Sequence, residues 1–548
     1  MHLGRSLAFL VVVVCTDRRR ANLGDQLALG IACFWSPRAI PLPWLLWSNR
    51  SRCDGLGNAS YRINIKGAKL NQLRVASRVV LLAGLFFGGN FTNSPRASLQ
   101  AAGETNFIVV LADDCTYRDL GCYGGQAKTP NLDQFASEGM RMTRCFQTAP
   151  MCSPTRHNLY TGQYPVKTGA YPNHTQTFDH IKNVTHFLGP AGYRLALSGK
   201  THIGPRNLFP FQYSGKGNNP DMDAIDRLMR ESKESDQPFC LFACSNEPHT
   251  PWNKGDASQY PVDTIQLPEY LPDTPAMREG FSRYLAEISY YDGQVGQILE
   301  LLDKHELASS TVVIVLSEQG NSMPFAKWTC YDSGLQSAML VRWPGHIEAG
   351  SVSNAMVEYV DVLPTIMAIA GIKDEEGELD GQSFLSVLKG DADRHKEFVF
   401  GAMTTRGIIN GNDSYPIRSV RSATHKLILN LQHDQLFTNA CVKSPEFVSL
   451  IEAASRGDQH AAEAVDRYQN RPAVELYNVI DDPLEMNNIA GDPKNQSVIA
   501  ELRTELDTWM ESQGDLGVET ELRANEHKKK SRRPAGRKKS SEASATGT

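Results

Sequence analysis

The chain has 548 residues, 41% hydrophobic and 21% charged, which is an ordinary globular composition; its length excludes a peptide scaffold and fits two to four average domains, or one large α/β domain with a smaller companion. The net charge is −5, yet residues 528–539 hold eight lysines and arginines, so the rest of the chain carries about −13. This mildly acidic body argues against a partner nucleic acid, because binding one requires a basic face.

Two short apolar runs near the N-terminus have the pattern of export signals. They are residues 6–15 (SLAFLVVVVC) after Arg5, and residues 79–87 (VVLLAGLFF) after four basic residues between 66 and 78. Each run has the length of a signal-peptide core and is well short of the roughly 20 residues that span a bilayer. We therefore expect an exported protein (periplasmic, secreted or in a lysosome-like compartment), with residues 1–103 a leader outside the fold. The alternative is a buried core helix.

The first convincing strand is Asn106–Ala112 (NFIVVLA), which runs directly into Asp113 and Asp114. Its apolar, β-branched character predicts a buried strand. Two adjacent carboxylates can ligate a metal or move protons. An acidic strand end taken alone, however, is more often a turn or a helix cap.

The pentapeptide from Cys152 to Arg156 (CSPTR) is the sharpest local signal. Pro154 fits only the first turn of a helix, so we predict a helix that begins at or just after Cys152. Free N–H groups and the dipole at that end favour an anion, and Arg156 would lie one turn on, on the same face. A reactive group beside a fixed cation suits a sulfate or phosphate ester. A buried structural cysteine beside a surface arginine is the alternative.

Three later apolar runs also end in polar clusters. They are Tyr193–Ser198 before Lys200 and His202, Phe239–Cys244 before His249, and Thr311–Leu316 before Glu318 and Gln319. Their alternation with helix-like segments predicts an α/β sheet with parallel strands. Because such sheets build their sites at the carboxyl ends of strands, four polar endings predict one shared site. The chain ends in a segment, residues 525–548, that we expect to be a disordered basic tail.

Cys152-x-Pro-x-Arg156, followed by Leu159-Tyr-Thr-Gly162, closely resembles the signature of the type I sulfatases, members of the alkaline phosphatase superfamily whose cysteine is oxidised to Cα-formylglycine. The resemblance covers about residues 104–510. It extends to Thr129–Asp133 (TPNLD), Pro248–Pro251 (PHTP) and Leu476–Ala490 (LYNVIDDPLEMNNIA). Within the family the heparan N-sulfatases, or sulfamidases, are the most similar, in residues 200–205 (KTHIGP), 271–278 (LPDTPAMR) and 290–296 (YYDGQVG).

The resemblance implies an α/β fold of the alkaline phosphatase/sulfatase type. A large mixed, mainly parallel sheet flanked by helices would occupy residues 104–390, the catalytic domain. A smaller C-terminal α+β subdomain, with an antiparallel sheet and a terminal helix, would occupy residues 391–524. Within it we expect a strand at 419–431 and a turn around Leu476–Val479.

The resemblance also implies roles for the site residues. One divalent cation, Ca²⁺ in preference, would be held by Asp113, Asp114, Glu318, Gln319 and the modified Cys152. Arg156 and Lys200 would hold the formylglycine hydrate, His202 would act as its base, and His249 with Lys327 would bind sulfate and assist the leaving group. The family's usual Asp-Asn or Asp-His pair is here Glu318-Gln319, each longer by a methylene. Oxygen ligands are kept, so a hard cation still fits, but the pair does not by itself fix the ion's position, ligand count or metal preference.

The chemistry of these residue types supports that reading. A thiol is a poor ligand for Ca²⁺, so Cys152 beside an acidic cluster makes sense if it becomes an aldehyde hydrate. One hydroxyl of the hydrate would attack sulfur while the metal, Lys200 and Lys327 neutralise the ester oxygens. His249 or Lys327 would protonate the leaving atom, and His202 would then deprotonate the second hydroxyl to release sulfate. The odd number of cysteines, eleven, would leave ten ordinary thiols.

Other polar residues are interpreted as structural. His157 is expected to pack in the interior. Asn173, His174 and His180 lie in a segment that could line the substrate cleft, but packing roles are favoured for them. Five cysteines are expected to be buried thiols or local pairs: Cys115, Cys122, Cys145, Cys240 and Cys244.

The sequence thus predicts a formylglycine-dependent sulfatase for a sulfated glycan, with a formylglycine-generating maturation enzyme as partner. A sulfamidase is preferred over an O-sulfatase, and loops at 171–179 and 207–219 are expected to select the sugar. A phosphoester hydrolase of the same superfamily is one alternative, but its usual two-metal site rich in Asp and His is not matched here. A glycan-binding pseudo-sulfatase, in which Cys152 stays a thiol, is another.

Overall fold

A computed structural model of the protein describes residues 105–527. The two N-terminal apolar runs, the leader at 1–103 and the basic residues 528–548 lie outside this range, so the predictions made for them stay predictions. Among the described residues, no helix combines the length and the apolar character that crossing a membrane requires.

An eight-stranded sheet forms the centre of the larger part. Its four predicted strands are β1 (Asn106–Leu111), β3 (Arg194–Gly199), β5 (Phe239–Cys244) and β6 (Thr311–Leu316). They are neighbours in the order β3-β5-β1-β6, and every pairing among them is parallel. The remaining strands are β4 (Gln212–Ser214) at one edge and β7 (Gln336–Arg342), β2 (Met140–Phe146) and β8 (Ser351–Glu358) at the other. Only β7 runs antiparallel to its neighbours, which confirms the predicted mixed, mainly parallel sheet.

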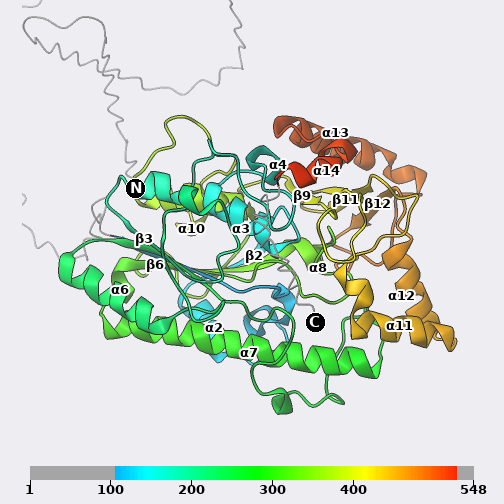
Figure 1. Ribbon diagram of the computed structural model, residues 1–548, viewed down its shortest axis with the longest axis horizontal. Coiled ribbons are helices and arrows are strands. Elements are labelled where there is room, and N and C mark those ends of the chain that lie inside the picture. Colours follow the sequence, from blue (N-terminus) through cyan, green and yellow to red (C-terminus); the bar gives the residue numbers. More distant parts are fainter. Residues whose placement is uncertain (1–104, 528–548) are drawn as a thin grey trace, which may run out of the picture. The chain divides into compact units, whose positions relative to one another are not determined.

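Helices cover both faces of this sheet because its central strands are buried on both sides (Figure 1). On one face lie α2 (Pro130–Glu138), α6 (Met222–Ser235) and α7 (Pro275–Lys304); on the other lie α3 (Cys152–Thr161), α5 (Val184–Leu188), α9 (Val362–Ile369) and α10 (Leu385–Leu388). Alternate residues of β1 supply the two cores. Val110 packs in one cluster with Leu285 of α7, and Val109 packs in the other with Leu159 of α3.

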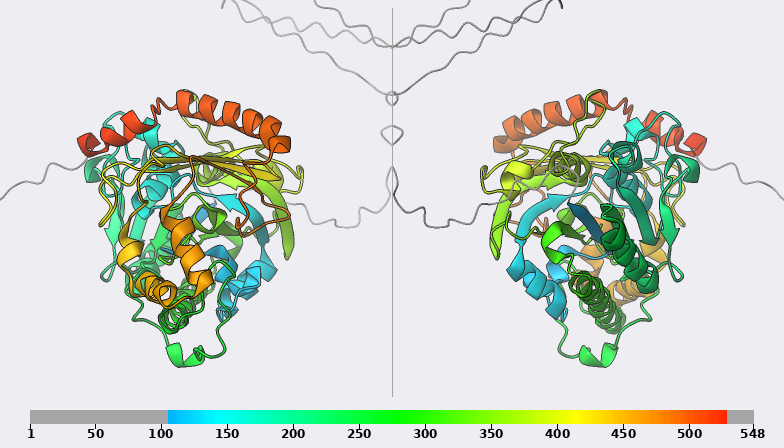
Figure 2. Two further views of the ribbon diagram at one scale, coloured as in Figure 1. Left: turned by 90° about the vertical axis from the view of Figure 1, so that its right-hand side faces the viewer. Right: turned by 90° about the vertical axis from the view of Figure 1, so that its left-hand side faces the viewer.

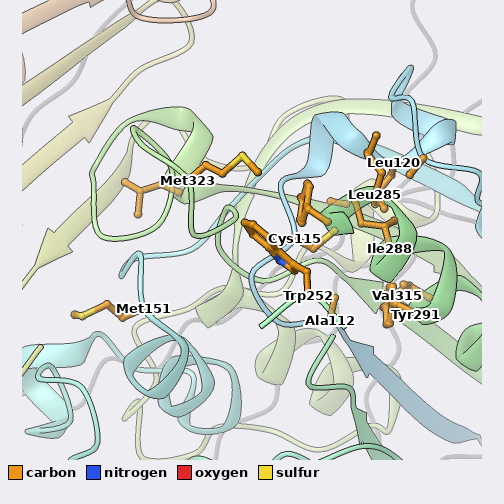
Figure 3. Close-up of a cluster of buried hydrophobic side chains, with 14 of the residues drawn as sticks. Ala112, Cys115, Leu120, Met151, Trp252, Leu285, Ile288, Tyr291, Val315 and Met323 are labelled. Atoms are coloured by element: carbon orange, nitrogen blue, oxygen red, sulfur yellow. The ribbon is translucent and has the colours of Figure 1, made fainter. Parts of the chain in front are cut away.

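The core on the α7 side supports the loops that follow the strands (Figure 3). Ala112, Met151, Trp252 and Met323 are all buried in it, and each lies close in sequence to a predicted site residue. Helix α7 contributes Leu285, Ile288 and Tyr291 to the same cluster. The loops that carry the polar residues are therefore anchored by apolar packing beneath them.

The C-terminal part contains a second, four-stranded antiparallel sheet, as predicted. Its strands are β9 (Val399–Met403), β10 (Ile417–Arg421), β11 (His425–Asn430) and β12 (Val474–Asn478), in the order β12-β11-β10-β9. Helix α13 (Gln496–Ser512) packs Leu506 and Trp509 on the sheet, and α14 (Val518–Leu522) follows it (Figure 2). Helices α11 (Pro445–Ser455) and α12 (Gln459–Gln469) pair with each other, and α11 packs on α7.

Two expectations about this subdomain need correction. Residues 419–431 do not form one strand but the hairpin of β10 and β11, because the Ser422 hydroxyl accepts hydrogen bonds from the Thr424 and His425 amides and closes a turn. Leu476 to Asn478 belong to strand β12, and the expected turn begins only at Val479.

Buried ion pairs connect the larger part to the C-terminal subdomain. Asp332, at the start of α8 (Asp332–Leu335), accepts hydrogen bonds from Arg421 Nε at 3.0 Å and from Lys426 Nζ at 2.8 Å. All three side chains are less than a tenth exposed. Since α8 ends the loop that follows β6, these bonds tie that loop to the β10–β11 hairpin.

We predict that Asp332→Asn lowers the free energy of unfolding by about 3–5 kcal/mol, because it leaves the buried Arg421 without its charged partner and removes one of the two carboxylates that pair with Lys426. Chemical denaturation followed by circular dichroism measures this. The control is Asp507→Asn on α13, whose ion pair with Arg503 is about half exposed and is expected to matter by less than about 1 kcal/mol. Equal losses in the two variants would contradict a role for the buried pairs.

Candidate active site

Polar side chains follow all four parallel strands at one edge of the sheet. Asp113 and Asp114 follow β1, Lys200 and His202 follow β3, His249 follows β5, and Glu318 and Gln319 follow β6. At the end of β3, Gly199 has a φ of +96°, and a Cβ there would lie 2.0 Å from the Cys244 carbonyl oxygen. Only glycine therefore lets the chain turn toward Lys200 so close to β5.

Helix α3 begins at Cys152, as the pentapeptide predicted, and every residue of it is buried. Pro154 lies in the first turn, and the Thr155 hydroxyl fixes the entry by donating to the Ala149 carbonyl at 2.6 Å. Burial raises the pKa of Cys152 to about 11, so the encoded side chain is a neutral thiol. The side chain nevertheless reaches the cavity described below.

Arg156 fixes α3 to three strand ends. It is fully buried, and its Nε lies 2.8 Å from Glu318 Oε1, after β6. Its Nη1 donates to the Lys200 carbonyl at 3.1 Å, after β3, and its Nη2 lies 4.0 Å from Asp113 Oδ2, after β1. One guanidinium thus connects the ends of three parallel strands, a geometry that its several fixed donors allow.

Two buried lysines pair with the two aspartates. Lys327 Nζ lies 2.7 Å from Asp114 Oδ2, and Lys200 contacts Asp113. Burial would raise the pKa of Asp114, but the charges of Lys327 and His249 outweigh it and lower that pKa. Burial lowers the pKa of Lys200 to about 8.

The carboxylates of Asp113, Asp114 and Glu318 form a buried group whose oxygens lie within 4.8 Å of one another. Gln319 joins them by donating from Nε2 to Asp114 Oδ1 at 2.6 Å. Three buried oxygens have neither a hydrogen-bond nor an ion-pair partner among the described residues: Asp113 Oδ1, Glu318 Oε2 and Gln319 Oε1. A donor set made only of oxygens, with lone pairs left over, fits a hard divalent cation such as Ca²⁺ or Mg²⁺.

Several of these residues have a left-handed backbone, which non-glycine residues seldom adopt. Asp114, Glu318, Trp328, His174 and His202 have φ values of 62°, 62°, 67°, 59° and 48°. Each such conformation costs free energy that the surrounding packing must supply, and such positions concentrate at functional sites. The strained backbone at this edge of the sheet therefore indicates a functional site rather than a set of ordinary turns.

The two predicted histidines lie at the mouth of the site. His249 Nε2 lies 3.6 Å from Asp114 Oδ2, and its Nδ1 is 2.6 Å from the Thr250 carbonyl oxygen. The nearby Asp114 raises the pKa of His249, but burial and the two lysine charges outweigh it and lower the pKa to about 4. His202 Nε2 lies 2.6 Å from Nδ1 of His174, and burial strongly lowers the pKa of His202.

A cavity of about 490 Å³ opens over these groups. Its floor includes Cys152, His202, His249 and Lys327. The rest of its lining is contributed by Asn173, His174, Thr250, Trp328, Gly407, Ile408, Ile409 and Ala440. Since Gly407 to Ile409 lie between β9 and β10, the C-terminal subdomain completes the cavity wall.

The structure brings all ten predicted residues together, in the cavity lining, in the ion pairs, or, for Gln319, through its hydrogen bond to Asp114. The sequence reading missed others. His174 and Asn173 were expected to pack but line the cavity, and Ser322 donates to Asp114 Oδ2 at 2.9 Å. In the sequence, only the position of His174 in a segment that could line the cleft indicates a place at the site. Nothing in the pattern indicated Ile408 and Ile409.

Other expectations have mixed outcomes. His157 is fully buried against the Ser153 and Gly204 carbonyls, as expected, and His180 stacks on Phe178 outside the cavity. The loop at 207–219, expected to select the sugar, does not line this cavity, because it holds the edge strand β4. The five cysteines named above are free thiols, not local pairs.

Two family models and several curated relatives match this chain. The sulfatase family model matches residues 105–372, and the model of the N-sulphoglucosamine sulphohydrolase C-terminal region matches residues 320–442. An ulvan-active sulfatase of Formosa agariphila is 32% identical, over 75% of this chain and 81% of that protein. Human N-sulphoglucosamine sulphohydrolase is 27% identical, over 75% of this chain and 91% of that protein.

Solved structures share the fold. A Bacteroides thetaiotaomicron protein of glycosaminoglycan metabolism has a TM-score of 0.61 at 20% identity and covers 75% of this chain and 97% of its own. A second structure, of a protein in complex with its substrate D-glucosamine-2-N,6-O-disulfate, has a TM-score of 0.58 at 18% identity. The match covers 75% of this chain and 99% of that protein's chain. The family model and the curated relatives identify a hydrolase of sulfate esters or sulfamates. The chain belongs to the sulfatase family, and its relatives there include a sulfamidase and an ulvan-active sulfatase.

We predict that millimolar CaCl₂ raises the melting temperature of the protein by a few degrees, because a cation that binds only the folded state stabilises it. Differential scanning fluorimetry with and without a chelator measures this. Asp113→Asn should lose the shift. Asp292→Asn, which changes a buried aspartate of α7 away from the cluster, should keep it. An equal shift in both variants would show that the cation binds elsewhere.

Proposed function

We propose that this protein is a formylglycine-dependent sulfatase that removes sulfate from a glycan. The observation that carries the proposal is the position of Cys152. It stands at the first turn of a buried helix, lines the cavity together with Lys327, and is close enough to Asp114, Glu318, Lys327 and Arg156 for their charges to act on it. A helix N-terminus with nearby cations suits an anionic ester. A hard cation held by oxygen ligands also binds a hydrate oxygen better than a thiol sulfur.

Asp113, Asp114, Glu318 and Gln319 would hold the divalent cation, Ca²⁺ in preference, with the modified residue 152 as a further oxygen ligand. When bound, the cation supplies a Lewis acid that stabilises negative charge on the ester oxygens. Glu318-Gln319 fits this role in spite of its extra methylenes. Its carboxylate remains within the acidic group, and the amide oxygen is buried without another partner among the described residues.

The chain's own residues would divide the remaining work. One hydroxyl of the aldehyde hydrate at position 152 would lose its proton to solvent and form the new bond to sulfur as the ester S–O or sulfamate S–N bond breaks. Deprotonation of the second hydroxyl would then break the C–O bond to sulfate, so that sulfate leaves and the aldehyde is regenerated for rehydration by water. Arg156 and Lys200 hold that residue in place. His249 or Lys327 donates a proton to the leaving oxygen or nitrogen, and His202 accepts the proton of the second hydroxyl. A formylglycine-generating enzyme, which must supply an oxidant, is the partner that this scheme requires.

The small ligand set favours a sulfatase over a two-metal phosphoesterase. Among residues 105–527, Asp113, Asp114 and Glu318 form the one group of three or more acidic, histidine or cysteine side chains with metal-ligand spacing. Two-metal phosphoesterases need a larger ligand set. Lys200 and Lys327 pair with Asp113 and Asp114, so the positive charge beside the acidic group comes from side chains rather than from a second metal.

A sugar is the leaving group that the cavity favours. Its volume of about 490 Å³ fits one or two saccharide units, and Ile408, Ile409 and Trp328 give it an apolar wall. Such a wall suits the C–H face of a pyranose ring. We prefer a sulfamate substrate because the match to the N-sulphoglucosamine sulphohydrolase C-terminal region includes this wall. An O-sulfated polysaccharide is the second candidate, favoured by the 32% identical ulvan-active relative.

The enzyme should release sulfate from N-sulfated heparin disaccharides once it has been produced together with a formylglycine-generating enzyme. N-, 2-O- and 6-O-sulfated disaccharides are offered separately, and sulfate is measured by ion chromatography. Aryl sulfate and aryl phosphate are compared in parallel. Cys152→Ala should lower kcat at least 10³-fold, since it removes the nucleophile.

Each other outcome has a definite meaning. Activity confined to an O-sulfated disaccharide would replace the sulfamidase proposal by an O-sulfatase. Faster turnover of the phosphate ester would overturn the sulfatase proposal. Full activity of Cys152→Ala would exclude residue 152 as the nucleophile.

The apolar wall gives a separate prediction. Ile409 is 77% exposed at the cavity rim, so Ile409→Ala should raise KM for the preferred disaccharide roughly tenfold and change kcat by less than about twofold. Ile480→Ala provides the control, because Ile480 is 55% exposed but lies outside the cavity. Steady-state kinetics on both variants checks this, and an unchanged KM for Ile409→Ala would remove Ile409 from the substrate site.

A further inference from the structure

We propose that His174 is a positioning residue for His202. Its Nδ1 accepts a hydrogen bond from His202 Nε2–H and so leaves the Nδ1 lone pair of His202 free to take a proton. The proposal rests on the base role of His202 proposed above. It concerns a residue that lines the cavity and is not among the proposed catalytic groups.

The contact itself is close and well defined. His202 Nε2 and His174 Nδ1 are 2.6 Å apart, and the ring centroids are 4.4 Å apart with the planes tilted by 54°. At this separation one of the two nitrogens must carry the hydrogen and the other must accept it. The contact therefore decides which tautomer His202 adopts.

The surroundings of His202 favour one of the two arrangements. Its other nitrogen, Nδ1, is buried and has no hydrogen-bond partner among residues 105–527. If His174 were the donor, His202 would carry its hydrogen on Nδ1, where a buried N–H would lack an acceptor. With His202 as the donor, Nδ1 instead presents an unprotonated lone pair. That is the state a general base requires.

Both histidines have a strained backbone conformation. His174 has a φ of 59° and His202 a φ of 48°, so both residues adopt the left-handed conformation that a non-glycine side chain disfavours. The two lie 28 residues apart in the chain, in separate loops. Two strained residues from different loops that meet ring to ring at a cavity indicate a selected contact rather than incidental packing.

A packing role explains these observations less well. His174 is exposed, whereas His157, the packing histidine nearby, is fully buried, donates from Nδ1 to the Ser153 carbonyl and accepts from the Gly204 amide at Nε2. Removing an exposed side chain should cost little stability. Its loss should instead appear in the rate, because an imidazole with the wrong tautomer cannot accept the proton.

Three substitutions at His174 test the proposal, in enzyme whose residue 152 has been converted. His174→Leu removes the acceptor at similar bulk, and His174→Gly removes it while tolerating the left-handed backbone. Both should lower kcat 10- to 100-fold with KM changed by less than about threefold, as for other lost orienting partners of histidines. His174→Asn should retain most of the activity, because its Oδ1 stands at the same position as Nδ1, accepts a hydrogen bond and tolerates positive φ.

His180→Asn is the matched control, since His180 is an exposed histidine of the same loop that stacks on Phe178 outside the cavity. It should leave kcat and KM unchanged. Wild-type kcat in the Leu and Gly variants, an Asn variant no better than Leu, or a change in KM alone would each overturn the proposal. Failure of the proposed function is distinguishable, because the wild-type enzyme would then release no sulfate although residue 152 is converted.

Discussion

The structure depends on one electrostatic constraint: the charges buried at the end of the sheet must neutralise one another. Three carboxylates, Asp113, Asp114 and Glu318, face three cations, Arg156, Lys200 and Lys327, and all six side chains are nearly inaccessible to water. Each would be costly to bury alone. Together they balance, and a divalent cation among the carboxylates would give the site the net positive charge that an anionic ester needs.

The strand pattern explains why much of this site could be predicted. Runs such as Asn106–Leu111 are apolar throughout because both faces are covered by helices, so a polar pair that follows directly must lie at the sheet edge. Pro154 similarly fixed the start of α3 at Cys152, since proline is tolerated only in a first turn. Local sequence patterns therefore predict the site residues whose positions are set by the end of a strand or the start of a helix.

Residues positioned by long-range packing could not be found in that way. Ile408 and Ile409 lie in a loop between two strands of the C-terminal sheet, and their place at the cavity follows only from how that sheet packs on the larger part. His174 reaches His202 across 28 residues through a loop with no regular period. The Ser422 turn that splits residues 419–431 into two strands also escaped notice, because a polar side chain closing a hairpin resembles a solvent-facing strand residue in sequence.

The central claim is that Cys152 becomes a formylglycine whose hydrate carries out sulfate release. The most direct measurement pairs the peptide mass spectrum of residue 152 with sulfate release, for protein made with and without a formylglycine-generating enzyme. We predict that sulfate release rises in proportion to the fraction of residue 152 that has exchanged its thiol for an aldehyde. Sulfate release at the same rate from protein whose Cys152 is wholly a thiol, or none from fully converted protein on any sulfated substrate, would contradict the account.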